Sequence, residues 1–132
     1  MIRQSIYLPS YRWKIIIYYW ARKEDAEEIL QTLQRFGATE ETQLCALNNL
    51  KDIMVNTGLT YTNDESRGTV MVISRASSPD ELWNTLDHEK GHAVTHISSA
   101  LDIDDSGEEK QYLAGEIAKR MYPVARLFIC DC

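Results

Sequence analysis

Residues 13–20 read Trp13-Lys14-Ile15-Ile16-Ile17-Tyr18-Tyr19-Trp20, a run dense in β-branched and aromatic side chains. Such side chains favour a strand, and a nearly uninterrupted apolar run favours a buried one. The run is far shorter than the roughly 20 apolar residues that a membrane-spanning helix needs. Charged residues 22–25 follow it, where a signal peptide would have a small-residue cleavage site. We therefore expect a buried strand in a cytoplasmic protein with no membrane partner.

After this strand the apolar spacing changes to a helical period. From Ala26 to Phe36 apolar residues recur every three or four positions, and Gly37 stands where a helix C-cap is common. A second helix is expected over residues 40–55. Residues 56–64 are rich in turn formers and predict an irregular segment, and the alternation over residues 69–74 predicts a second strand.

The clearest helix start lies at Ser78-Pro79-Asp80-Glu81, which combines a capping serine, a proline at the first helical position and a glutamate at the third. This helix should run to about Leu101, where an acidic loop ends it. A last helix is expected from about Glu108 to Tyr122. Pro123 should end or kink it, and continuation of the helix over residues 124–129 is the alternative to an end at this point.

The order strand, helix, helix, strand, helix, helix predicts an α+β fold, with a small sheet and about four helices. A chain of 132 residues suits one domain over its whole length, residues 1–132. Its net charge of -6 gives no general attraction for phosphate backbones or anionic membranes, so we expect no nucleic-acid partner.

The three cysteines, Cys45, Cys130 and Cys132, do not suggest a disulfide framework. Cys130 and Cys132 form one Cys-x-Cys pair, which would fill half of a tetrahedral metal site. We interpret these two residues as incidental thiols, with soft-metal binding or an oxidation response as the alternatives.

The third helix contains the motif His-Glu-x-x-His, formed by His88, Glu89 and His92. Residues four apart lie on one helix face, so both imidazoles can bind the same Zn²⁺. The intervening glutamate is offset around the helix, where it can hold a metal-bound water without being a ligand. Zinc lowers the pKa of that water to about 7, and the carboxylate accepts its proton. The alternative is a pair of surface or packing histidines.

A catalytic zinc usually has three protein ligands. His96 is a poor third ligand because eight helical residues rise about 12 Å, so we expect it to contact the site or the substrate, or to be a plain helix residue. A carboxylate from the last helix is the better candidate. We favour Glu108, which shares a face with Tyr112, over Glu109. Glu116 is a weaker ligand candidate, and its alternative role is a hydrogen bond to a metal-bound histidine.

Residues 85–92 and 107–118 together resemble the gluzincin branch of the zincin metallopeptidases. They are most similar to small, uncharacterised zinc peptidases encoded in bacterial, prophage and phage genomes. A glutamate four residues before a Tyr-Leu-x-Gly run looks like the third ligand in that family, which implies Glu108 here. The resemblance also implies a compact zincin-like core, one Zn²⁺ per chain and a peptide or protein substrate. In the zincin architecture the strand before the active-site helix borders the cleft, so residues 69–74 should pair with an extended substrate.

The sequence thus predicts a zinc metallopeptidase in which Glu89 is the general base, with His88, His92 and Glu108 as metal ligands. Tyr112, His96 and Tyr61 are the candidates for stabilising the oxyanion. One alternative is an inactive zincin-like module that keeps the metal and binds a partner peptide without cutting it. The other is a structural or adaptor protein without a metal.

Overall fold

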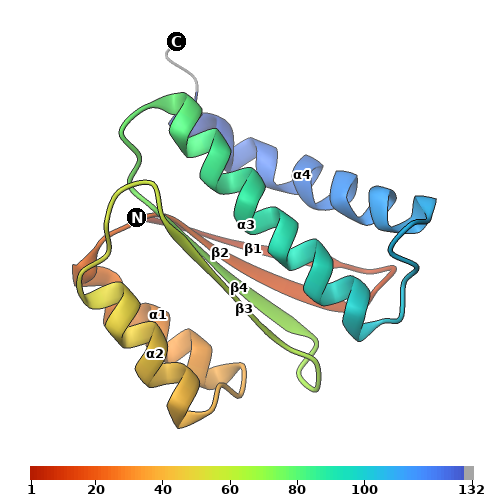
Figure 1. The fold of residues 1–132 in the computed structure, drawn as a ribbon, viewed down its shortest axis with the longest axis horizontal. Helices are drawn as coiled ribbons and strands as arrows, with labels where there is room; N and C mark the ends of the chain where they lie inside the picture. The colour runs from red at the N-terminus through yellow and green to blue at the C-terminus, as the bar shows by residue number, and fades with distance from the viewer. Residues whose placement is uncertain (130–132) are drawn as a thin grey trace.

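The computed structural model describes residues 1–129 and confirms the α+β class: a four-stranded sheet has helices on both faces (Figure 1). The interpretation of Cys130 and Cys132 therefore lies outside the described residues. The elements are β1 (Ile2–Leu8), β2 (Trp13–Ala21), η1 (Lys23–Asp25), α1 (Ala26–Arg35), α2 (Glu40–Lys51), β3 (Gly58–Asn63), β4 (Gly68–Ser74), α3 (Pro79–Ala100) and α4 (Glu108–Ile129). No helix within residues 1–129 is long and apolar enough to cross a membrane.

The sheet has the strand order β1-β2-β4-β3. The central strands β2 and β4 run parallel, and the edge strands β1 and β3 pair antiparallel with them. Along β2, Ile15 and Ile17 pack toward α3 and α4, whereas Ile16 packs with the residues of α1 and α2. Because both faces of β2 are buried, its sequence is apolar almost without a break rather than alternating.

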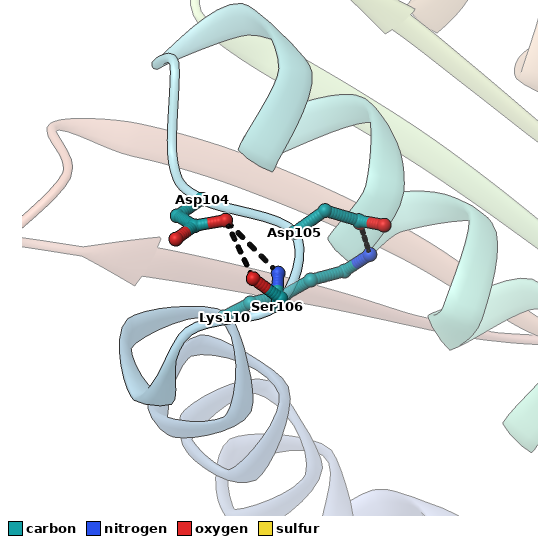
Figure 2. Close-up of polar contacts among 4 residues, drawn as sticks. All are labelled: Asp104, Asp105, Ser106 and Lys110. Carbon is teal, nitrogen blue, oxygen red and sulfur yellow. Dashed lines mark hydrogen bonds and ion pairs between the residues drawn. The ribbon is translucent and has the colours of Figure 1, made fainter.

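Several sequence predictions are confirmed, including β2, the α3 boundaries and the cap of α3. The Ser78 hydroxyl accepts a hydrogen bond from the Glu81 amide at 3.3 Å, which satisfies one of the unpaired amides of the first turn. The acidic loop after α3 is also confirmed (Figure 2). There Asp104 accepts hydrogen bonds from the amide and hydroxyl of Ser106, and Lys110 pairs with Asp105.

Several sequence predictions are wrong or incomplete. The segment predicted to be irregular contains β3, in which Leu59 and Tyr61 alternate with Thr60 and Thr62 as in a half-buried strand. The strand β1 was not predicted at all. The strand over residues 69–74 is the central strand β4, paired on both sides, so it has no free edge for a substrate. In addition, α2 ends at Lys51, and α4 continues through Pro123 to Ile129.

Candidate metal centre

The candidate metal centre lies on the side of α3 that faces β3, at one edge of the sheet. His88 and His92 are exposed, whereas the side chain of Glu89 turns under β3 and the residue is only 4% exposed. The helix explains the difference, because successive residues point about 100° apart around its axis. One helical turn therefore presents two accessible imidazoles beside one sheltered carboxylate.

The two imidazoles converge on one point. Their Nε2 atoms lie 3.1 Å apart, and the rings are close to perpendicular, with an angle of 84° between their planes. Two ligands at the usual Zn–N distance of about 2.05 Å lie roughly 3.3 Å apart at a tetrahedral angle, so the pair fits one ion. The same separation suits an N–H···N hydrogen bond when one ring has the proton on Nε2 and the other does not.

The carboxylate of Glu89 completes a compact group. The potential ligand atoms of His88, Glu89 and His92 all lie within 4.8 Å of one another. The Thr60 hydroxyl is 3.2 Å from Glu89 Oε2 and 3.3 Å from the Glu89 carbonyl oxygen, and it donates toward both. Two nitrogen donors beside a hydrogen-bonded carboxylate suit a divalent metal with borderline-soft preferences such as zinc.

Gly58 allows this carboxylate to lie so close to β3. A Cβ atom at Gly58 would be 2.6 Å from Glu89 Cγ and 2.8 Å from the carbonyl oxygen of Val72. Both distances are far below van der Waals contact, so only glycine fits here without a shift of β3 or of Glu89. The strand β3 thus contributes a space at Gly58 and a hydrogen-bond donor at Thr60.

Glu108 does not join this group. It lies on an exposed face of α4 with Tyr112, which is 71% exposed, and with Gly115, where an added Cβ would meet no atom within 4 Å. A groove between α3 and α4 is lined on the α3 side by residues that include Asp87 and Lys90. These residues lie roughly 100° and 160° around the helix from His88, so the side of α3 that faces α4 is not the side that bears His88. The role of Glu108 as a metal ligand stays a prediction that this arrangement does not support.

Glu109 and Glu116 lie near the turn between β1 and β2, beside the edge of the sheet opposite to β3. Burial raises the pKa of Tyr11 in that turn, and the negative charges of Glu109 and Glu116 raise it further. Glu116 also pairs with Arg120 at 2.7 Å. Within residues 1–129, neither carboxylate belongs to a group with the histidines.

His96 lies one turn beyond His92, and its hydrogen-bond partner is on β3. Its Nδ1 is 3.0 Å from the Thr62 hydroxyl, and its ring centroid is 6.1 Å from that of His92. Burial lowers the pKa of His96, the positive charge of a protonated His92 lowers it further, and Asp64 opposes both effects. His96 therefore borders the candidate centre without joining it.

Sequence reasoning missed the contribution of Gly58 and Thr60 because the turn formers around them concealed β3. The signal was present in the period-two alternation of Leu59 and Tyr61 with threonines. Tyr61, a candidate for oxyanion stabilisation, is half-buried and lies within 3.5 Å of the Asn63 side-chain amide. No family model, curated protein or solved structure matches the chain.

Proposed function

We propose that this protein is a zinc-dependent peptidase whose metal is held by His88 and His92 and whose general base is Glu89. One observation carries the proposal: the two imidazole nitrogens lie 3.1 Å apart beside a buried carboxylate that a neighbouring strand holds in place. A purely structural metal site has no need of a buried carboxylate that a neighbouring strand orients, whereas hydrolysis needs a base.

Zinc bound at the two histidines would polarise the substrate carbonyl and lower the pKa of a water molecule to about 7. Glu89 would accept one proton from the attacking water while oxygen adds to the carbonyl carbon. The same carboxylate would then deliver the proton to the leaving nitrogen as the C–N bond breaks. The Thr60 hydroxyl would keep the carboxylate oriented through both transfers, because it donates to one of its oxygens.

The second candidate is a metal-binding interaction module without catalytic activity. It is favoured by the ligand set, because within residues 1–129 no third histidine, cysteine or carboxylate joins His88, Glu89 and His92. Such a module would retain zinc and bind a peptide, and its properties would not depend on the base.

Zinc content tests the metal site directly. The full chain is exposed to excess Zn²⁺, desalted and analysed by plasma mass spectrometry, beside His92→Ala and the matched variant His96→Ala. We expect about one equivalent of zinc in the wild type and in His96→Ala, and none in His92→Ala. The reason is that His92 belongs to the metal group and His96 does not. A wild-type chain that retains no zinc would refute the proposal.

Activity distinguishes the two candidates. Glu89→Gln preserves the shape of the side chain but removes the base, so zinc and fold should remain. Cleavage of quenched fluorescent peptides should fall by roughly 10²- to 10⁴-fold. Zinc retention with equal cleavage by both proteins would assign the cleavage to another site, and zinc retention with no cleavage by the wild type would favour the interaction module.

A further inference from the structure

The free edge of β3 lies next to the candidate metal centre. Within residues 1–129, β3 pairs only with β4, so in this part of the chain the backbone groups along its other edge have no strand partner. An edge of this kind binds extended polypeptide by adding a strand, and the side chains of the added strand alternate between the two faces of the sheet. The inference that follows rests on the proposed function, and it names the substrate class.

A hollow opens on the opposite face of the same strand, between β3 and α2. Its walls are mainly apolar and include Leu33, Ala46, Leu59 and Tyr61. Cys45, a free and exposed thiol, also lines the hollow. In Figure 1, α1 and α2 lie on the far side of the sheet from α3, so β3 separates this hollow from the metal centre.

Thr60 of β3 takes part in both the metal centre and the hollow. Its hydroxyl contacts Glu89 on the α3 side, and the same residue lines the hollow on the α2 side. A strand added at this position would direct one side chain toward the histidines and the next toward the hollow, because consecutive residues point to opposite faces. The two sites are therefore one residue apart for an extended ligand.

We propose that the edge of β3 binds an extended, non-acidic polypeptide segment, and that the side chain next to the residue at the metal centre is apolar and enters the hollow. Charge supports the exclusion of acidic segments. Glu41 lines the hollow, Asp64 and Glu65 are exposed just beyond β3, and the whole chain has a net charge of -6. These carboxylates would repel an acidic segment bound along the strand.

The test uses the zinc-loaded Glu89→Gln chain, which should bind peptides without cutting them, and the same chain freed of metal. The probes are blocked octapeptides of serine and threonine that differ at one central position, which is leucine, alanine or aspartate. Calorimetry should give leucine, alanine and aspartate in order of falling affinity. The leucine probe should bind about tenfold tighter than the alanine probe, because its larger apolar surface is removed from water. N-methylation beside the leucine should weaken binding, because it removes a strand hydrogen bond.

Two variants of α2 locate the effect. Cys45→Trp fills the hollow from an exposed position and should remove the preference for leucine. Leu44→Trp is the matched control, because Leu44 is 60% exposed on the same helix and does not line the hollow. Leu44→Trp should retain the preference.

Three results would overturn the proposal: no binding of the leucine probe at millimolar concentration, equal affinity for leucine and alanine, or a leucine preference that survives Cys45→Trp. Dimers in sedimentation, with the β3 amides protected from exchange, would instead identify a second copy as the occupant and would also overturn it. If the zinc test fails but the metal-free chain still prefers leucine, the proposed peptidase function is refuted. The binding of peptides at the edge of β3 is then supported independently of it.

Discussion

Replacing Gly58 with alanine should destabilise the protein through one defined collision. The new Cβ would lie 2.6 Å from Glu89 Cγ, 2.9 Å from Glu89 Cδ and 2.8 Å from the Val72 carbonyl oxygen. The glutamate side chain is buried, and the carbonyl belongs to the central strand β4, so neither neighbour can move away freely. Overpacking by a single methyl group in such surroundings costs about 1–3 kcal/mol.

Thermal unfolding measures this cost. With an unfolding entropy of about 2.1 cal/mol/K per residue, 1–3 kcal/mol lowers Tm by roughly 4–11 °C in a chain of this length. Gly91→Ala is the matched control, because a Cβ at Gly91 would meet no atom within 4 Å. That change removes a glycine from the interior of α3 and should stabilise the protein by about 0.5–1 kcal/mol.

A double-mutant cycle then tests whether Glu89 is the partner in the collision. Glu89→Ala removes both side-chain carbons that the new methyl group would meet, so the double variant should be less destabilised than the sum of the single variants. The coupling should be about 1 kcal/mol, with the collision at Val72 remaining. Gly58→Ala within about 0.5 kcal/mol of the wild type, or additive effects in the cycle, would refute the close packing of Glu89 against β3.

Three further predictions follow from other contacts. Ser78→Ala removes the cap of α3 and should cost about 0.5–2 kcal/mol in urea unfolding, whereas an unchanged midpoint would show that the cap is unimportant. The pKa of His96 is lowered in the folded state, so the unfolded state of the metal-free protein should bind more protons than the folded state. The free energy of unfolding should therefore fall as the pH decreases below about 6.5. His96→Gln should flatten this dependence, and equal slopes for the wild type and the variant would contradict the prediction. Glu108→Ala should change zinc affinity by less than about tenfold in a chelator competition, because Glu108 lies outside the metal group, and a larger loss would restore it as a ligand.

The features that could be predicted from sequence are those with local causes. The cap at Ser78 and the convergence of His88 and His92 depend on residues within one or two helical turns. The apolar run of β2 was recognisable because both of its faces are buried.

The features that escaped prediction depend on contacts between distant segments. The rotation of α4 about its axis decides where Glu108 points, and the helical pattern of its apolar residues left two adjacent glutamates as candidates. Whether β4 is a central or an edge strand depends on which strands pair with it, and its own sequence does not specify that. The accommodation of Glu89 by Gly58 joins residues 31 positions apart, beyond the reach of any local motif.

The parallel pairing of β2 with β4 has a consequence for how the candidate centre is assembled during folding. Ile15 pairs with Thr69, 54 positions further along the chain, so the central pair closes a long loop before its contacts can form. α3 alone can bring the two imidazoles together, since both belong to one helical stretch. The carboxylate of Glu89 reaches its place only once β3 has joined β4 at the edge of the sheet. The two histidines thus depend on α3 alone, whereas the orientation of the base depends on the packing of α3 against the β3–β4 hairpin.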